Sequence, residues 1–357
     1  MSSDSKSKVL FVAHVPPPNH GAAIVGERVL SIISKIYDCK LLRLSNSKSI
    51  SSMGKGRTLS NVIFVLALYL KTFFYLIFYR PKIIYITPSL SGFAFLRDLP
   101  LLVLFYIYLF FSKSKVLCHV HMRPLLLMDS SILMTAWCFL SIKFEVILLS
   151  KSLRNDFSKN FNPKKLHLLS NTSQVKYDKN ESLKGRQSIL YIGHIMESKG
   201  AIRLLALAQK FSSKNVTFHF AGEFGGEADR AKFFNLMEHL PEGLVYYHGP
   251  VSGEQKVRLF NSADLLALPS FSEAQPLTII EAFSCGLPVV ATRTGGVVDM
   301  LDNSIGRCVE FDNFESAIIE VLGLGKGNFE QRCLNKYSRC FSESKFISEC
   351  LNIFKAN

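Results

Sequence analysis

The chain has 357 residues, of which 48% are hydrophobic and 20% charged, so its composition is that of a folded protein long enough for two domains and excludes a disordered chain. The net charge of +14 belongs wholly to the first half, since residues 1–184 carry 25 basic and 9 acidic side chains and residues 185–357 carry 17 and 19. This asymmetry indicates two domains with different partners, and the basic one favours an anionic lipid surface or a phosphorylated ligand over nucleic acid, for which no zinc-finger, helix-turn-helix or RNP-like pattern is present.

The N-terminus, MSSDSKSK, does not have the pattern of a secretory signal peptide. The eight cysteines include no CxxC pair, and several lie in apolar runs, where a free thiol behaves as a small hydrophobic side chain. We therefore expect a cytoplasmic protein with reduced cysteines.

Short apolar runs alternate with helical patterns along the whole chain, as βαβ units require. A polar stretch over 171–187 coincides with the boundary between the basic and the neutral half, and we expect the linker there. Nine of the apolar runs predict buried parallel strands. They cover residues 8–15, 82–89, 115–121, 145–150, 188–194, 216–222, 244–249, 264–270 and 287–292.

Two apolar segments are candidates for membrane spans. Residues 62–79 form an 18-residue run interrupted by Lys71 and Thr72, and residues 99–111 form a run of 13. A spanning helix needs about 20 predominantly apolar residues, and a central lysine costs roughly 2.5–3.5 kcal/mol on insertion. The second run is too short. The first is compatible with a span, a core helix or a helix with a lipid-contacting face, and the flanking basic residues favour docking at a membrane surface.

The strongest local pattern is LPSFSEAQPLTIIEAFSCGLPVVATRTGG over residues 268–296. A strand is expected to end at Pro269, and the loop after it carries Glu273. A short helix follows, beginning near Leu277 and containing Glu281. Because ligands of open α/β sheets bind at the carboxyl ends of strands, and helix N-termini favour anions, we expect a diphosphate on these amides and sugar hydroxyls on the two carboxylates.

A structural role is the alternative for both glutamates. Thr278 to Glu281 fit the spacing of a capping box, in which the glutamate closes the first turn of its own helix. Glu273 is also compatible with a solvated loop. The spacing alone leaves ligand binding and local capping both open.

The stretch resembles the signature of family 4 of the retaining glycosyltransferases, an E-x7-E pattern followed by a Gly-Leu-Pro-Val-Val strand and a Gly-Gly turn. Other segments are similar to the family at the expected places: PPPNHGAA over 16–23, a strand ending in His121, GHIMESKG over 193–200, and the approach to the motif over 246–270. The resemblance covers most of the chain, is strongest over 189–297, and extends to bacterial enzymes of surface-polysaccharide assembly.

This resemblance implies an α/β fold called GT-B, in which two Rossmann-like, doubly wound parallel-sheet domains face a central cleft. The first domain would bind the acceptor and the second the nucleotide sugar. The expected domains are residues 1–175, a linker over 176–187, residues 188–337, and a final helix over 338–357 that crosses back to the first domain.

The resemblance also assigns roles to particular residues. Glu273 would contact donor-sugar hydroxyls, Glu281 the ribose, and Lys199 would neutralise the diphosphate. His121 is expected at the active site as well, although His119 lies on the same strand face and both histidines are compatible with the core. The expected catalytic residues are His121, Lys199 and Glu273, and the expected donor-binding residues are Gly21, Ala22, Gly193, His194, Lys199, Gly249, Glu273, Gln275, Pro276, Leu277, Thr278 and Glu281.

Two positions depart from the family pattern. His194 stands where an arginine that pairs with the diphosphate is frequent, and Asp299 replaces the more usual glutamate after Gly-Gly. Because some enzymes of surface-polysaccharide assembly lack the arginine, the first change weakens the diphosphate assignment rather than the resemblance.

The expected reaction is departure of a nucleoside diphosphate, UDP by preference, from a sugar that is transferred with retention of configuration. No Asp-x-Asp motif and no zinc-like Cys/His spacing occur, so we expect no metal and no cofactor. The expected partners are the nucleotide sugar, a glycan or polyprenyl-diphosphate-linked acceptor, and the anionic inner face of the cell membrane, where the protein would be peripheral.

Two other functions remain open. A sugar-nucleotide 2-epimerase shares this architecture, and UDP release that requires an acceptor would favour transfer over epimerisation. A non-enzymatic RNA- or membrane-binding adaptor would require Glu273 and Glu281 to be idle, which fits poorly with an intact ligand-binding strand end.

Overall fold

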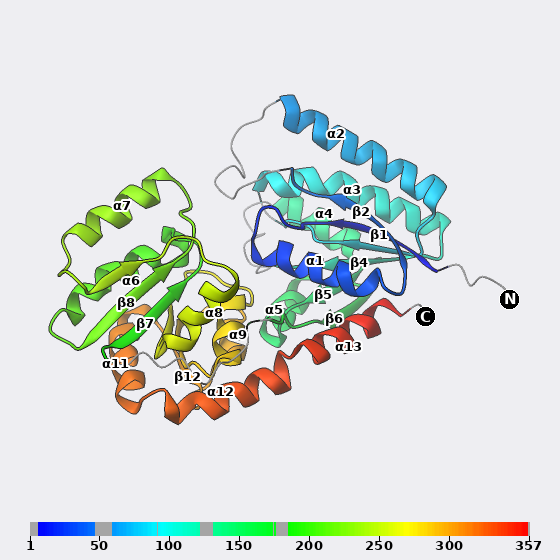
Figure 1. Ribbon diagram of the computed structural model, residues 1–357. Helices are drawn as coiled ribbons and strands as arrows, with labels where there is room; N and C mark the ends of the chain where they lie inside the picture. The colour runs from blue at the N-terminus through cyan, green and yellow to red at the C-terminus, as the bar shows by residue number, and fades with distance from the viewer. Residues whose placement is uncertain are drawn as a thin grey trace. The chain divides into compact units, whose positions relative to one another are not determined.

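A computed structural model describes residues 6–46, 59–90, 92–121, 131–173, 175 and 185–355. The chain divides into two compact units, each with its own parallel sheet (Figure 1). Unit 1 comprises Met1–Ser170 together with Phe346–Asn357, and unit 2 comprises Asn171–Lys345. The chain therefore enters unit 2 at the start of the polar stretch and returns to unit 1 near its end.

Unit 1 contains a six-stranded parallel sheet. Its central strands are apolar on both faces, as expected for strands that helices cover on both sides. The strands are β1 (Lys8–Ala13), β2 (Asp38–Arg43), β3 (Ile83–Ile86), β4 (Lys115–His119), β5 (Glu145–Leu148) and β6 (Lys165–Leu168). Their order across the sheet is β2-β1-β3-β4-β5-β6, so the strand order reverses between β1 and β3.

Unit 2 contains a second six-stranded parallel sheet. Its strands are β7 (Gln187–Ile192), β8 (Val216–Ala221), β9 (Val245–Tyr247), β10 (Leu265–Leu268), β11 (Val289–Thr292) and β12 (Gly306–Val309). The order β12-β11-β10-β7-β8-β9 is the doubly wound Rossmann arrangement, in which the first strand pairs with the second on one side and the fourth on the other. The reversal lies between β7 and β10.

All nine predicted strands are present, with ends that differ by a few residues. The sequence missed β2, β6 and β12, each of which lies at an edge of its sheet. Edge strands have one unpaired side and bury fewer side chains, so they need no continuous apolar run. The half-exposed sequence DCKLLR of β2 has none, and so it gave no strand signal.

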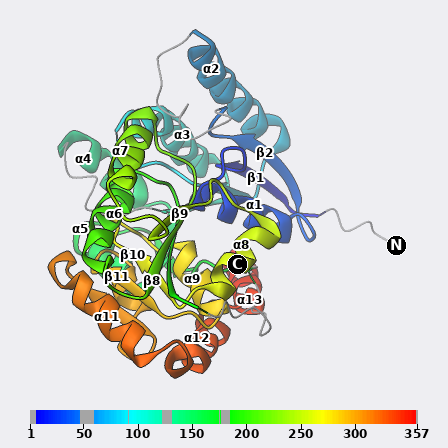
Figure 2. The same cartoon turned by 60° about the vertical axis from the view of Figure 1, so that its left-hand side comes forward.

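Helices connect the strands of both sheets. In unit 1 they are α1 (Gly21–Ile33), α2 (Leu59–Phe74), the π-helix η2 (Tyr75–Tyr79), α3 (Gly92–Phe111), α4 (Ser131–Ser141) and α5 (Lys151–Asn160). In unit 2 they are η4 (Glu197–Lys199), α6 (Ala201–Ala208), η5 (Gln209–Phe211), α7 (Glu227–Glu238), α8 (Gly253–Ser262), α9 (Leu277–Ser284), α10 (Val297–Met300), η6 (Phe311–Asn313), α11 (Phe314–Leu324) and α12 (Gly327–Cys340). Right-handed crossovers that run in opposite directions from β7 and β10 place α6 and α7 on one face of the sheet and α9 on the other (Figure 2).

Two helices of unit 1 are long and apolar enough to cross a membrane, by length and composition: Leu59–Tyr79, which joins α2 and η2, and Ala94–Phe111 of α3. The predicted 13-residue run is the end of a 20-residue helix that begins at Gly92, so the length argument against it does not hold. In the most apolar stretch of each helix, 22% and 28% of the residues are buried. Leu101 and Phe105 are among the core residues of α3. Both helices therefore expose large apolar side chains, such as Leu70 and Phe78 of the first and Phe110 and Phe111 of the second.

The last helix, α13 (Glu343–Phe354), completes unit 1 from residue Phe346 onward. The Tyr37 hydroxyl donates to the carbonyl of Phe354 at 3.0 Å, and Lys115 Nζ donates to the carbonyl of Ile353 at 2.8 Å. The ring of Phe354 stacks on Phe11 of β1 with centroids 6.0 Å apart. The end of the chain is therefore part of the core beneath β1.

Candidate functional site

The β7 and β10 strand ends define the candidate site of unit 2. Ligands of doubly wound sheets bind outside the carboxyl ends of the strands where the strand order reverses. The loop after β7 carries Gly193 to Gly200, and the loop after β10 carries Pro269 to Pro276. Because the two strands are paired, side chains from these loops meet.

Gly200 allows the two loops to touch. Its φ of +76° is in the left-handed region, and a Cβ there would lie 1.9 Å from the carbonyl oxygen of Pro269. No other residue fits this contact without moving the backbone. The backbone N–H of Phe271 also donates to the carbonyl of Ser198 at 3.1 Å, so the loops are held together on both sides of Lys199.

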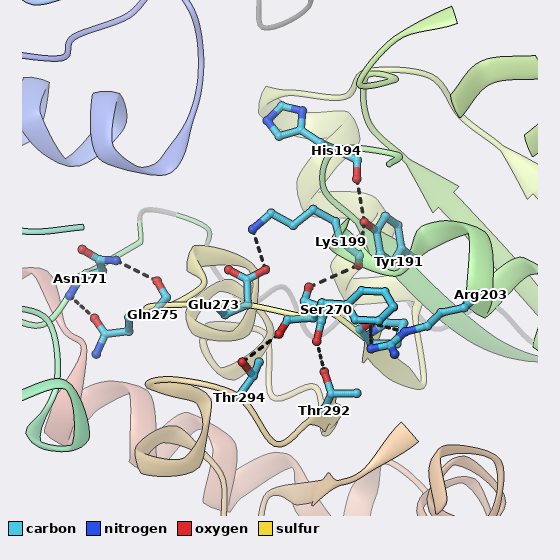
Figure 3. A network of polar contacts seen from close by, with 12 residues as sticks. Asn171, Tyr191, His194, Lys199, Arg203, Ser270, Glu273, Gln275, Thr292 and Thr294 are labelled. Atoms are coloured by element: carbon cyan, nitrogen blue, oxygen red, sulfur yellow. Dashed lines mark hydrogen bonds and ion pairs between the residues drawn. The ribbon is translucent and has the colours of Figure 1, made fainter. Parts of the chain in front are cut away.

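An ion pair joins two of the predicted residues. Lys199 Nζ lies 2.9 Å from Glu273 Oε1, with 35% of the lysine side chain and 11% of the glutamate side chain exposed (Figure 3). Burial of the carboxylate strengthens a charge-assisted hydrogen bond of this kind. The sequence predicted both residues, and the structure brings them into contact.

A network of polar side chains binds the backbone of the two loops that carry this pair (Figure 3). The Tyr191 hydroxyl donates to the carbonyl of His194 at 2.8 Å, and Ser270 Oγ donates to the carbonyl of Lys199 at 3.3 Å. Arg203 Nε donates to the carbonyl of Pro269 at 2.7 Å. These side chains bind backbone carbonyls and therefore fix the loops rather than face a ligand. Nothing in the sequence analysis indicated this network.

His194 has a buried ring nitrogen without a partner. Its Nδ1 has no hydrogen bond within the described residues, and burial lowers the pKa of the imidazole. The ring is therefore neutral at neutral pH and does not replace the cation of the arginine that the family frequently has here. It remains able to exchange a hydrogen bond with a ligand.

The side chain of Gln275 has a structural role. Its Oε1 accepts from the backbone N–H of Asn171 at 2.6 Å. The backbone carbonyl of Gln275 accepts from Asn171 Nδ2 at 2.9 Å (Figure 3). Gln275 is also buried. These contacts hold the start of unit 2 against the loop after β10.

Helix α9 begins at Leu277, where the sequence predicted it. Its N-cap is Pro276, which makes no side-chain capping bond. Thr278 is then the second residue of the helix and Glu281 the fifth, so neither occupies the position that a capping box requires. The capping-box interpretation is wrong, because the helix starts one residue before Thr278.

Glu281 instead forms an ion pair with Lys256 of α8. Glu281 Oε1 lies 2.6 Å from Lys256 Nζ, and Glu281 is only 7% exposed. The other oxygen, Oε2, is buried and has no hydrogen-bond partner within the described residues. A buried carboxylate oxygen without a donor is costly, so this atom has the character of a ligand acceptor. The sequence did not identify Lys256.

Three glycines close the other side of the same sheet edge. Gly222, at the end of β8, has a φ of +149°, and a Cβ there would lie 1.8 Å from the carbonyl oxygen of Gly193. The backbone N–H of Gly222 donates to the carbonyl of Gly249 at 2.8 Å. The predicted residues Gly193 and Gly249 are thus joined through Gly222, which the sequence did not single out.

In unit 1, the predicted Gly21 and Ala22 form the first turn of α1. The preceding residue, His20, is the N-cap, and its Nδ1 accepts from the backbone N–H of Ala23 at 3.3 Å. Gly21 is exposed, and a Cβ there would meet nothing within 4 Å. The loop before α1 follows β1, at the strand-order reversal of the first sheet.

His121 lies just beyond the end of β4 and next to His119. The two rings are 4.0 Å apart, and His119 Nδ1 is 2.7 Å from the Tyr85 hydroxyl. Burial lowers the pKa of His119 to about 3 and that of His121 well below its usual value. His119 is thus tied to Tyr85 through Nδ1, and the Nε2 atoms of both histidines are buried without a partner within the described residues. Of the two, His121 lies nearer the ligand-binding end of the strand.

No group of three or more His, Cys, Asp or Glu side chains that could hold a metal ion occurs in the part of the chain that the structure describes. The eight cysteines are all free thiols.

The two Rossmann-like units define the GT-B class of fold, and solved structures share it over nearly the whole chain. The sucrose-phosphate synthase of Thermosynechococcus elongatus aligns with a TM-score of 0.76 at 14% identity and 98% coverage of each chain. Anabaena Alr3699/HepE, in complex with UDP and glucose, aligns with a TM-score of 0.68 at 16% identity, covering 97% of this chain and 99% of its own. The predicted α/β GT-B fold is therefore confirmed.

Residues 173–336 match the family model described as glycosyl transferases group 1. This region corresponds to unit 2 and contains Lys199, Glu273 and Glu281. The alpha-galactosylglucosyldiacylglycerol synthase of Streptococcus pneumoniae (strain ATCC BAA-255 / R6) is 34% identical over 163 residues, which are 44% of this chain and 43% of that protein. The chain spans less than half the length of the first curated relatives that it matches.

Proposed function

We propose that this chain is a glycosyltransferase that takes a sugar from a UDP-sugar and transfers it to a glycan or lipid-linked acceptor. The observation that carries the proposal is the arrangement at the β7–β10 strand ends. There the Lys199–Glu273 pair precedes the N-terminus of α9, and Glu281 lies inside that helix with one buried oxygen unpartnered. The match of residues 173–336 to glycosyl transferases group 1 supports it.

Transfer breaks the bond between the anomeric carbon and a diphosphate oxygen and forms one between that carbon and an acceptor hydroxyl oxygen, whose proton leaves with the diphosphate. Negative charge then grows on the leaving diphosphate while the sugar becomes oxocarbenium-like. Lys199 and the first-turn N–H groups of α9 supply a cation and oriented dipoles that can stabilise that charge. Glu273 positions the Lys199 ammonium through Oε1 and would accept a donor-sugar hydroxyl through its other oxygen.

Glu281 would bind the ribose of the donor. Its Oε1 accepts from Lys256 Nζ, so the carboxylate is held in position before the donor arrives. Its Oε2 would accept a ribose hydroxyl, which satisfies the atom that has no partner in the free protein. Lys256 is then a positioning residue for the donor site.

The acceptor and the location are part of the proposal. The Anabaena complex with UDP and glucose supports a UDP-sugar donor, and the pneumococcal relative, named for a diacylglycerol product, supports a lipid acceptor. The surface-polysaccharide role rests on the sequence resemblance given above. We place the protein on the cytoplasmic face of the membrane, since its first half is strongly basic and α2 and α3 expose apolar side chains.

We also propose transfer without a metal ion and with retention of configuration. Lys199 and Lys256 supply positive charge at the two carboxylates, and the sequence has no Asp-x-Asp motif. Retention rests on the resemblance to the retaining family.

The test has two stages. A thermal-shift panel of UDP- and GDP-sugars should identify a donor that raises the melting temperature. At a donor concentration of 100 times the dissociation constant, binding adds about 2.7 kcal/mol to the free energy of unfolding. UDP release is then measured with and without lipid-linked acceptors, and the anomer of the product is read by NMR. Release without an acceptor, together with a changed sugar, would indicate epimerisation. No stabilisation by any nucleotide sugar would refute the proposal.

A further inference from the structure

Exposed apolar side chains are concentrated on one surface of unit 1. Of the 23 large hydrophobic side chains that are exposed among the described residues, 14 lie on α2, η2 and α3. From Leu59 to Phe78 they recur every three or four residues, so they form one stripe along the helix. The stripe on α3 ends at Phe111, which is 86% exposed. A soluble surface helix has its polar face outward, whereas α2 and α3 are apolar on the outward face as well as on the buried one.

A groove of about 750 Å³ lies between the end of α2 with η2 and the C-terminal end of α3. Phe73 and Ile77 line it from one helix, and Leu104, Ile107 and Phe111 line it from the other. Its volume is within the roughly 300–1,000 Å³ range of ligand-binding sites, and its walls are mostly apolar. It therefore fits an apolar chain.

Three cations line the same groove. Arg80 and Lys82 follow η2, and Lys113 follows α3. All three are exposed, and none forms an ion pair within the described residues. The one acidic residue from position 59 to 115 is Asp98, which is buried and paired with Arg97. The walls of the groove are thus mostly apolar, and the charged residues that line it are all cationic.

Hydrogen bonds fix the segments that carry these cations. Arg80 has a φ of 53°, uncommon for a residue other than glycine, and its Nε donates to the carbonyl of Ile77 at 3.0 Å. The Ser114 Oγ and the Tyr108 hydroxyl both donate to the carbonyl of Pro81, at 2.7 and 3.3 Å. The backbone that carries these cations is therefore fixed beside the apolar walls.

We propose that this groove binds an anionic phospholipid of the bilayer, with an acyl chain along the apolar walls and the phosphate among Arg80, Lys82 and Lys113. The charge complementarity selects an anionic head group, and the surrounding apolar stripes of α2 and α3 enter the interface of the same leaflet. The site rests on the surface of unit 1 alone and would hold even if unit 2 transferred no sugar.

Flotation of the full chain with vesicles tests the surface. Phosphatidylcholine vesicles with and without phosphatidylglycerol are compared at low salt for the parent and for the triple variant Arg80→Gln/Lys82→Gln/Lys113→Gln. The control is Lys214→Gln/Arg230→Gln/Arg258→Gln, which removes the same charge from exposed positions of unit 2. We expect the groove variant to lose about 100-fold in partition to anionic vesicles and the control to lose little. Equal losses in both variants would overturn the site.

A monomeric short-chain lipid tests the groove itself. Dihexanoylphosphatidylglycerol should raise the melting temperature of the parent, whereas dihexanoylphosphatidylcholine and inorganic phosphate should not. Ile107→Trp fills the groove with an apolar ring, and Val103→Trp places the same ring one turn away on the exposed face of α3. We expect Ile107→Trp to abolish the shift and Val103→Trp to keep it. A full shift in folded Ile107→Trp, or an equal shift with phosphate alone, would refute lipid binding in the groove.

Discussion

Replacing Lys199 with alanine separates a catalytic role from a structural one. The Lys199–Glu273 pair is 2.9 Å long, but the lysine side chain is 35% exposed, so solvent screening limits its contribution to the free energy of unfolding to about 1 kcal/mol or less. Loss of a preorganised transition-state partner costs roughly 2.7–4 kcal/mol. We therefore expect turnover to fall at least ~10²-fold. The melting temperature should change by less than about 4 °C.

The assay is UDP release with donor and acceptor present, and Glu273→Gln supplies a double-mutant cycle. If Lys199 acts only by holding Glu273, the change to alanine should cost nothing further in the Glu273→Gln background. If Lys199 also meets the leaving diphosphate, the two losses should largely add, which is the result we expect. A folded Lys199→Ala protein with near-normal turnover would remove Lys199 from the mechanism.

Three more predictions concern donor binding, metal ions and acid stability. Glu281→Gln should lower turnover by at least ~10²-fold in the same assay with the fold intact by circular dichroism, because an amide weakens both the Lys256 contact and the ribose hydrogen bond. Activity in excess EDTA should equal activity with magnesium, and loss that metal restores would contradict the mechanism. The buried His119 has its pKa lowered from 6.5 to about 3, so its neutral form stabilises the fold above pH 6.5 and this contribution is lost as the pH falls below that value. Other buried histidines, such as His121 and His14, add to the same loss, so urea unfolding at pH 7 and 5.5 should show a total loss that is about 1 kcal/mol smaller in His119→Phe than in the parent.

Most of the fold could be predicted because buried parallel strands need continuous apolar runs. The nine predicted strands supply the centres of both sheets and one outer strand of unit 2, and the expected helix at Leu277 begins where the structure has it. The edge strands β2, β6 and β12 escaped because their partial exposure permits polar residues at positions that a central strand would fill with apolar ones. The prediction that the run over 99–111 is too short was wrong because Arg97 and Asp98 interrupt the apolar sequence inside α3 and conceal that the helix starts at Gly92.

The site could be predicted where its residues lie in recognisable motifs at the ends of neighbouring strands. Glu273 and Glu281 are eight positions apart on one loop and helix, and Lys199 follows the neighbouring strand, so the topology alone brings them together. Lys256 reaches Glu281 from α8, and Asn171 reaches Gln275 across 104 positions of the chain. Contacts of this kind depend on how separate elements pack, which no local spacing reports. The spacing of Thr278 and Glu281 left a capping box and ligand binding both open, and the helix start at Leu277 excludes the capping box.

The return of α13 to unit 1 has a consequence for how the chain folds as it is made. Unit 2 is an insertion between two parts of unit 1, so residues 171–345 emerge from the ribosome before helical residues Phe346–Phe354 can complete unit 1. At about 5–20 residues per second, synthesis of that insertion lasts roughly 9–35 s. During this interval the ring of Phe11 lacks its stacking contact with Phe354, and the Tyr37 hydroxyl lacks the Phe354 carbonyl that accepts its hydrogen bond. The unit that is translated first is therefore the last to be finished, and it is the one with the apolar outer surface, so an early encounter with a membrane or a chaperone would protect it.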